Sequence, residues 1–307
     1  MASPTRPFLL HATAFLTAAV WGSTFISTKV LITCGLAPEH IFTLRFLIAY
    51  VPLLCLCHKH LRARTWADEG LFLALGLTGG SLYFLSENYA LRFSTATNVS
   101  LIVCSCPLVT TFLHRLLVPG AKLGRSQTLG ALLAFTGMVV VVLNGHFVLR
   151  LSPLGDALAL MACLCWAVYS ILMERIGDRY SAAFITRKTF FYGLLTTLPY
   201  YLLLHPDLPS PTLLLLPKVA ANLLFLSIVA SLLCFWVWAY VIERLGSVVT
   251  TNYVYVNPLS TIALAALILG ERITPWFALG AALILVGMFL SNRHKKGSRS
   301  VVAPRRD

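Results

Sequence analysis

The sequence predicts an all-helical integral membrane protein with ten transmembrane helices, arranged as two inverted repeats of five. Hydrophobic residues make up 58% of the 307 residues and charged residues only 11%, against roughly a quarter charged in soluble domains. Long apolar runs, such as 126–149, 151–173 and 245–270, match the ~20 residues that cross about 30 Å of hydrocarbon. The phrase LGALLAFTGM at 129–138 recurs as LGAALILVGM at 279–288. Composition therefore predicts a bilayer environment, and the recurring phrase predicts a duplication.

Apolar runs separated by charged residues, proline or glycine define the ten expected helices. They cover residues 9–32, 38–57, 69–91, 94–118, 126–145, 153–173, 181–204, 216–241, 246–270 and 275–292. The first run lacks the basic start and small-residue cleavage site of a signal peptide, so we expect it to be retained. The connections are short, which predicts a first repeat at 1–145, a second, inverted repeat at 151–292 and a basic cytoplasmic tail at 293–307.

Basic residues gather on one side of the predicted membrane. That side holds Arg6, Lys59, Arg62, Arg64, Lys122, Arg125, Arg175, Arg179, Arg244 and the tail from Arg293 to Arg306. The other side holds Arg92, Arg150, Lys218 and Arg272. We expect the chain to span the cytoplasmic membrane. By the positive-inside rule, both of its termini are then expected on the cytoplasmic side. The net charge of +13 is thus interpreted as a topology signal and not as a nucleic-acid surface.

The two copies of the recurring phrase lie on expected helices five spans apart, so the second copy should cross the membrane in the opposite direction. The spacing of Tyr89 and Pro107 also returns between Tyr240 and Pro258. In each copy two glycines lie seven residues apart on one helix face, at 130 and 137 and again at 280 and 287. Such faces allow close helix packing in membranes. Inverted repeats are a physical basis for alternating access, which favours a transporter.

Pro107 and Pro258 stand near the midpoints of their expected helices. Each removes a backbone donor and frees the carbonyl four residues earlier, at Val103 and Val254. Bilayers tolerate such a defect only where protein or a wet cavity covers it. Interrupted helices at matching places in two halves indicate a binding site near the midplane, although simple packing kinks are the alternative.

Charged side chains inside the expected spans are candidates for the translocation path, because charges in hydrocarbon are costly. They are Lys29, Arg45, Glu87, Arg187 and Lys188. The motif Phe-x-x-Arg recurs around Arg45 and Arg187, so we expect these two arginines to be quasi-equivalent cavity groups, one of which attracts an anionic part of a substrate. Glu87 would balance Lys29 or Arg45 and carry a coupling proton. Structural pairing and snorkelling to headgroups are the alternative.

Aromatic and amide side chains surround these charges and are further candidates to line a wet pocket. They are Trp21, Tyr83, Asn88, Asn98, Trp166, Tyr169, Trp236, Trp238, Asn252, Tyr253, Tyr255 and Asn257. Interfacial belts and ordinary packing are the competing interpretation. Asn98 and Asn257 rank highest, because amides in otherwise apolar helices need partners.

Several motifs in this order and spacing resemble the EamA family of the drug/metabolite transporter superfamily. They are WGSTF at 21–25, RF at 45–46, ENYAL at 87–91, NPL at 257–259, GERIT at 270–274 and LGAALILVGM at 279–288. The resemblance covers nearly the whole chain and implies a ten-helix carrier in a bacterial cytoplasmic membrane. Such a carrier moves small metabolites, often amino acids or their relatives, and commonly transports them outward. One departure is PGAKL at 119–123, which lacks the acidic residue of GERIT. If that motif only caps a helix, with Thr274 as N-cap and Pro275 at N1, the loss is harmless.

Other classes of function find less support in the residues. Three Cys-x-Cys pairs place their thiols on different helix faces, so we expect no metal site. The eight histidines form no His-Glu-x-x-His pattern, which disfavours an intramembrane enzyme, and no cofactor is expected. Within transport, an exchanger of nucleotide sugars or phosphorylated metabolites is the alternative, since Arg187 with Lys188, or Lys29 with Arg45, could hold several negative charges. Substrate, direction, coupling ion and oligomeric state stay open.

Overall fold

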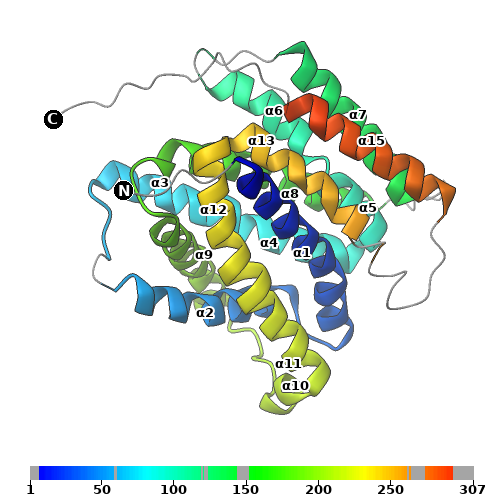
Figure 1. Ribbon diagram of the computed structural model, residues 1–307. Coiled ribbons are helices and arrows are strands. Elements are labelled where there is room, and N and C mark those ends of the chain that lie inside the picture. The colour runs from blue at the N-terminus through cyan, green and yellow to red at the C-terminus, as the bar shows by residue number, and fades with distance from the viewer. Residues whose placement is uncertain are drawn as a thin grey trace.

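The computed structural model describes residues 7–58, 61–118, 120, 124–143, 152–260, 263 and 274–292, and every element in these ranges is helical. The first half contains α1 (Pro7–Thr33), α2 (Pro38–Leu56), α3 (Trp66–Gly76), η1 (Leu77–Ser81), α4 (Leu82–Phe93), α5 (Ala96–Val103), α6 (Cys106–Leu117) and α7 (Arg125–Leu143). The second half contains α8 (Pro153–Gly177), α9 (Ala182–Leu204), α10 (Pro211–Leu215), α11 (Pro217–Leu224), η2 (Phe225–Leu233), α12 (Cys234–Leu245), α13 (Ser247–Thr251), η3 (Asn252–Tyr255) and α15 (Pro275–Asn292). Figure 1 shows how these helices pack into one bundle.

Seven helical stretches of the described chain are long and apolar enough to cross a membrane, so the protein is a multi-pass membrane protein. They are Phe8–Thr33, Pro38–Leu56, Asn98–Leu117, Arg125–Leu143, Pro153–Gly177, Pro217–Leu245 and Pro275–Asn292. The expected span at 69–91 is also helical but is divided by η1, and that at 181–204 is helical but carries two adjacent basic residues. The expected span at 246–270 lies partly outside the described residues. Ten spans therefore stay a prediction.

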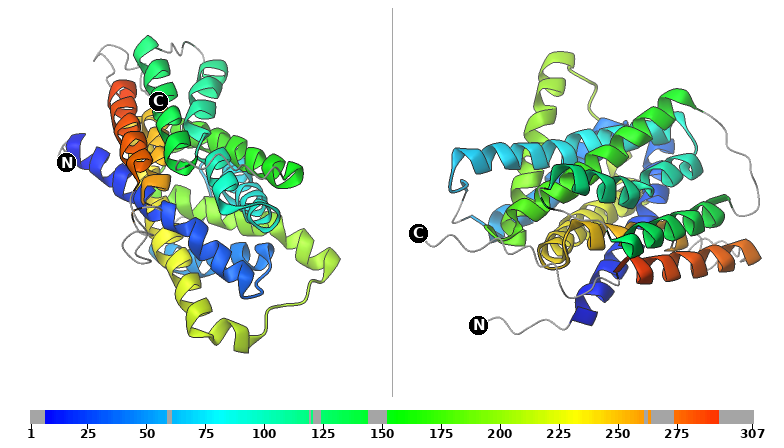
Figure 2. Two further views of the ribbon diagram at one scale, coloured as in Figure 1. Left: turned by 90° about the vertical axis from the view of Figure 1, so that its right-hand side faces the viewer. Right: turned by 90° about the horizontal axis from the view of Figure 1, so that it is seen from above.

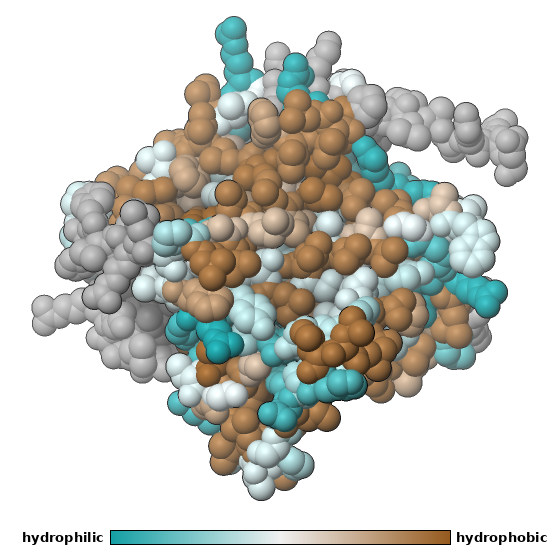
Figure 3. Space-filling model, turned by 180° about the vertical axis from the view of Figure 1, so that it is seen from behind, coloured by the Kyte–Doolittle hydropathy of each residue, from teal (hydrophilic) through white to brown (hydrophobic). Residues whose placement is uncertain are grey.

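The surface is apolar over broad areas, as a bilayer requires. Large hydrophobic side chains such as Phe8, Leu203 and Phe289 are more than half exposed. Figure 3 shows hydrophobic side chains spread over most of the visible face, with polar groups among them. Lipid tails solvate such side chains favourably, whereas their exposure to water is unfavourable.

The two copies of the recurring phrase lie on α7 and α15, which pack side by side in Figures 1 and 2. Gly130 faces Gly287 and Gly137 faces Gly280, so the two helices run antiparallel. A Cβ atom added to Gly137 would lie 2.7 Å from the Gly280 carbonyl oxygen. The glycines thus let the two backbones touch, as their seven-residue spacing predicts.

Helix starts follow ordinary capping chemistry. The Thr65 hydroxyl accepts a hydrogen bond from the Asp68 amide at 3.1 Å, and the Ser181 hydroxyl caps α9 in the same way. Thr274 accepts from the Phe277 amide at 3.2 Å, which confirms it as the N-cap of α15, with Pro275 as its first residue. Each cap satisfies one of the free donors at a helix start.

Four helical stretches are irregular near the centre of the bundle. Segments η1 and η2 are π-helical, and both occur in the third expected helix of their half. Helices α5 and α6 are separated by Cys104 and Ser105, just before Pro107. The 3-10 segment η3 ends three residues before Pro258. Irregular backbone at membrane depth needs a lining of protein or water, which directs attention to the space between these segments.

Candidate functional site

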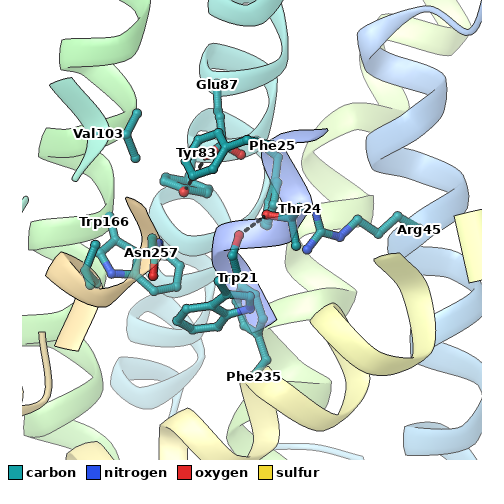
Figure 4. Close-up of a pocket in the computed structure, with 12 residues that line it drawn as sticks. Trp21, Thr24, Phe25, Arg45, Tyr83, Glu87, Val103, Trp166, Phe235 and Asn257 are labelled. Atoms are coloured by element: carbon teal, nitrogen blue, oxygen red, sulfur yellow. Dashed lines mark hydrogen bonds between the residues drawn. The ribbon is translucent and has the colours of Figure 1, made fainter. Parts of the chain in front are cut away.

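A central cavity of about 30 Å³ lies where α1, α2, α4, α5, α8, α12 and η3 converge. Figure 4 shows its side chains. The lining residues are Trp21, Thr24, Phe25, Arg45, Tyr83, Phe84, Glu87, Val103, Trp166, Phe235, Val254 and Asn257. Half of these residues are aromatic, and the wall carries one guanidinium and one carboxylate, a composition typical of small-molecule sites.

Trp21 joins the α1 wall to the π-helical segment η2. Its indole Nε1 donates a hydrogen bond to the Ala230 carbonyl at 2.9 Å. Its ring meets Trp166 edge-on, with centroids 5.1 Å apart, and Trp238 at 4.7 Å. A π-helical turn leaves backbone carbonyls outside the regular ladder, and Trp21 satisfies one of them.

Arg45 reaches the cavity from α2, and Figure 4 shows its side chain directed toward Thr24. It is only 3% exposed. Its Nε donates to the Ser231 hydroxyl of η2 at 2.5 Å, and its guanidinium carbon lies 4.4 Å from the centre of the Phe84 ring. A buried guanidinium is tolerated where polar and aromatic partners hold it, and these contacts position Arg45 in the cavity wall.

Glu87 is 6% exposed and stands on α4, one turn beyond Tyr83. The Tyr83 hydroxyl donates to the Glu87 carboxylate at 2.9 Å. In the part of the chain that the structure describes, neither Glu87 nor Arg45 forms a salt bridge, but their opposite charges attract across the cavity. The site thus offers one positive and one negative group to a bound molecule.

Six of the residues singled out from the sequence line this cavity: Trp21, Arg45, Tyr83, Glu87, Trp166 and Asn257. Pro107 and Pro258 lie outside the lining, each next to an irregular segment. The Lys29 ammonium instead donates to the Leu91 carbonyl at 2.6 Å, so it does not balance Glu87.

The other predicted residues in the bundle make structural contacts. Asn88 Nδ2 donates to the Pro38 carbonyl at 3.1 Å. Asn252 Nδ2 donates to the Ser291 hydroxyl at 2.8 Å, which ties η3 to α15. The backbone amide of Asn98 donates to the Thr95 hydroxyl at 3.2 Å. Tyr169 packs on Gly79, Tyr253 hydrogen-bonds His11, and Tyr255 donates to the Ala131 carbonyl.

Arg187 and Lys188 do not share the cavity of Arg45. They line a separate pocket near the start of α9. Arg187 Nη2 donates to the Leu61 carbonyl at 3.1 Å, and the Lys188 ammonium contacts Glu69 at 2.7 Å. Trp236 borders a third pocket. The motif shared by Arg45 and Arg187 therefore places them in different surroundings.

Val103 and Val254, whose carbonyls the two prolines were expected to free, also line the cavity. Sequence reasoning missed the other four lining residues, Thr24, Phe25, Phe84 and Phe235. Thr24 lies one turn from Trp21 and could have been found from that spacing. The others are apolar and look like ordinary core residues, so no signal in the sequence separates them from the core.

Comparison with known proteins identifies the family of this arrangement. The model of the EamA-like transporter family matches residues 9–143 and 153–293. The chain belongs to the EamA-like transporter family. As a member, this EamA-like transporter acts on a small-molecule substrate at the membrane.

Relatives of this EamA-like transporter carry transport functions in their names. An uncharacterized transporter of Archaeoglobus fulgidus is 29% identical over 92% of this chain and 96% of its own length. A probable amino-acid metabolite efflux pump of Escherichia coli (strain K12) is 25% identical, with 91% and 93% covered. A probable terminal-alkyne amino-acid exporter of Streptantibioticus cattleyicolor is also 25% identical, with 92% and 93% covered.

A solved crystal structure shares the fold of this EamA-like transporter. Its TM-score is 0.71 at 19% identity, and the match covers 92% of this chain and 95% of the other. At that identity the likeness concerns the fold alone.

Proposed function

We propose that this EamA-like transporter exports an amino acid or a closely related compound across the cytoplasmic membrane by alternating access. The observation that carries the proposal is the pair of opposite charges in the central cavity. In it, Arg45 binds the carboxylate of the cargo, and Glu87 binds its ammonium group. The aromatic wall formed by Trp21, Trp166 and Phe235 packs against the cargo side chain.

The names of two relatives support amino-acid cargo and outward direction. One is called a probable amino-acid metabolite efflux pump and the other a probable terminal-alkyne amino-acid exporter. Both align over more than nine-tenths of this chain.

For the mechanism we propose a ten-helix inverted repeat, with both termini in the cytoplasm. The antiparallel packing of α7 on α15 supports it, since these helices carry the two copies of the recurring phrase. So do the π-helical segments η1 and η2, which occupy matching places in the two halves. Two such halves can exchange conformations and open the cavity to each side in turn.

Glu87 is proposed to couple transport to protons. A proton on its carboxylate removes the negative charge that holds the ammonium group, so proton binding and cargo binding compete. Competition of this kind produces exchange of one for the other across the membrane. The Tyr83 hydroxyl remains beside the carboxyl group in either state and orients it.

The alternative cargo, a nucleotide sugar or phosphorylated metabolite, carries two or more negative charges. Arg45 is the one basic side chain among the described residues that line the cavity. Lys29, Arg187 and Lys188 are engaged elsewhere. A single guanidinium opposite a carboxylate favours a zwitterion over a polyanion.

Proteoliposomes test the proposed cargo. Purified protein is reconstituted into vesicles, and one set receives radiolabelled amino acids while another receives sugar nucleotides. The proposal would be supported by saturable uptake of an amino acid for which the Arg45→Gln variant has a raised KM and the exposed-site control Arg92→Gln does not. Saturable uptake of sugar nucleotides alone would overturn it.

A further inference from the structure

A second pocket opens where α2 ends and α9 begins, separate from the central cavity. Its volume is about 560 Å³. The short segment 61–65 and the first turn of α3 form its rim. Four basic side chains line it, Arg62, Arg64, Arg187 and Lys188, against the single carboxylate of Glu69, which makes a net charge of +3. The pocket is therefore suited to an anion.

The segment that carries Arg62 and Arg64 is fixed by three hydrogen bonds. Arg187 donates to the Leu61 carbonyl at 3.1 Å, the Ala63 amide donates to Glu69 at 2.7 Å, and the Arg64 amide donates to the Tyr180 hydroxyl at 2.7 Å. A fixed backbone reduces the entropy that a ligand must overcome. The two arginines are thus positioned before any ligand arrives.

The charges of this pocket are unevenly neutralised. The Lys188 ammonium lies 2.7 Å from the Glu69 carboxylate, and these two cancel. Within the described ranges, neither Arg62 nor Arg64 takes part in a salt bridge. Both arginines are exposed at the rim and also border the neighbouring pocket that Trp236 lines. The Arg64 guanidinium carbon lies 5.4 Å from the centre of the Tyr180 ring. A guanidinium group can bind a phosphate in a bidentate manner.

The inner wall of the pocket is apolar and continues onto the lipid-facing surface. Tyr50 and Phe191 lie with ring centroids 6.3 Å apart and join α2 to α9. Exposed apolar side chains extend this wall, with Leu47 and Val51 on α2 and Leu195, Leu198 and Leu202 on α9. This track has the form that an acyl chain requires.

The depth of the pocket matches the headgroup level of a bilayer. Arg187 stands five residues after Ala182, about 7.5 Å into α9 at 1.5 Å per residue, whereas Arg62 and Arg64 lie beyond the end of α2. Trp66 at the rim is 88% exposed, and tryptophan is enriched at membrane interfaces. A ligand in this pocket would contact water, headgroups and acyl chains together.

We propose that this pocket binds one anionic phospholipid, with its phosphate on Arg62 and Arg64 and an acyl chain along the groove between α2 and α9. Phosphate is the chemistry that the charges select, and a soluble phosphate ester would share it. The apolar track selects the lipid, because a soluble ester has nothing to place there. Basic pockets between membrane helices are known to recognise lipid headgroups in this way. The proposal does not depend on the identity of the transported cargo.

Thermal unfolding of the purified protein in detergent tests the proposal through ligand stabilisation. Phosphatidylglycerol and phosphatidylcholine with identical acyl chains are titrated, and glycerol phosphate serves as the soluble arm. The test variant is Arg62→Gln with Arg64→Gln. The control variant is Arg92→Gln with Lys218→Gln, which removes the same charge from exposed sites outside the pocket.

We expect phosphatidylglycerol to raise the melting temperature of the wild type and the control more than phosphatidylcholine does. The test variant should need about 30-fold more phosphatidylglycerol for the same shift, since two basic groups are lost. An equal response to both lipids, or an unchanged response in the test variant, would overturn the proposal. An equally strong response to glycerol phosphate would assign the pocket to a soluble anion and also overturn it.

Discussion

The glycine contact between α7 and α15 allows a quantitative test by a single methyl group. Gly137 lies against Gly280 of the other helix, and a Cβ at this position would stand 2.7 Å from both the Gly280 carbonyl oxygen and the Ile284 amide nitrogen. Ordinary contact begins at 3.4 Å. The Gly137→Ala substitution therefore forces the two backbones apart by roughly 0.7 Å, the difference of these distances, because backbone atoms cannot rotate away.

The cost of this separation follows from packing. Overpacking a close contact costs about 1 to 3 kcal/mol, and a gap of this size also weakens dispersion contacts along the interface. Lipid cannot compensate, since no hydrophobic force drives these helices together in a bilayer. We expect the free energy of unfolding to fall by about 1 to 3 kcal/mol.

Reversible unfolding in mixed micelles of rising SDS content, followed by tryptophan fluorescence, measures this change. Gly70→Ala is the matched control, because Gly70 is also helical and a Cβ there meets nothing within 4 Å. The control should be neutral or stabilising by up to about 1 kcal/mol. Adding Gly280→Ala to Gly137→Ala should cost less than the sum, since the helices are already separated. If Gly137→Ala and Gly280→Ala change the free energy of unfolding no more than Gly70→Ala does, the backbones of α7 and α15 do not touch as described.

Three further substitutions test the central cavity. Arg45→Gln should raise the KM for the cargo by about tenfold or more, the loss of one charge-assisted bond, while the protein still reaches the membrane; a KM equal to that of the wild type would exclude a contact between Arg45 and cargo. Glu87→Gln should remove the dependence of transport on a pH gradient, measured in vesicles with an imposed gradient, and dependence that persists would exclude Glu87 as the proton carrier. Trp21→Phe leaves the Ala230 carbonyl without its indole donor and should lower the free energy of unfolding by about 1 to 3 kcal/mol in the same SDS titration. Its control is Trp276→Phe, which should change this free energy little because Trp276 is half exposed on α15.

Much of the helical architecture was predictable from the sequence because bilayers impose simple rules. Apolar length predicts helices, and the spacing of Gly130 and Gly137 predicts the close approach of α7 to α15. The N-cap at Thr274 follows from its place before a proline. The same rules do not predict the π-helical segments η1 and η2, since a π-helical turn depends on packing against neighbouring helices. The sequence signals only η1, through the adjacent glycines Gly79 and Gly80 within it.

The candidate site was predictable where it contains a charged residue, because burying a charge in hydrocarbon is energetically unfavourable. Arg45 and Glu87 stand out for that reason and do line the cavity. Arg187 is equally expensive but lies near a helix end, where the Leu61 carbonyl and the rim of a second pocket accommodate it. The free-energy cost of burial shows that a charged side chain needs partners. It does not show which partners the fold supplies. Phe235 carries no such cost and was missed.

Competition with charge-deleted cargo tests the central claim most directly. Once the proteoliposome screen has identified a transported amino acid, its amide, which lacks the carboxylate, and its N-acetyl form, which lacks the ammonium group, are compared as inhibitors of uptake. The account predicts that both inhibit the wild type poorly, that Arg45→Gln no longer discriminates against the amide, and that Glu87→Gln no longer discriminates against the N-acetyl form. Equal inhibition of the wild type by the amino acid and both derivatives would contradict the account.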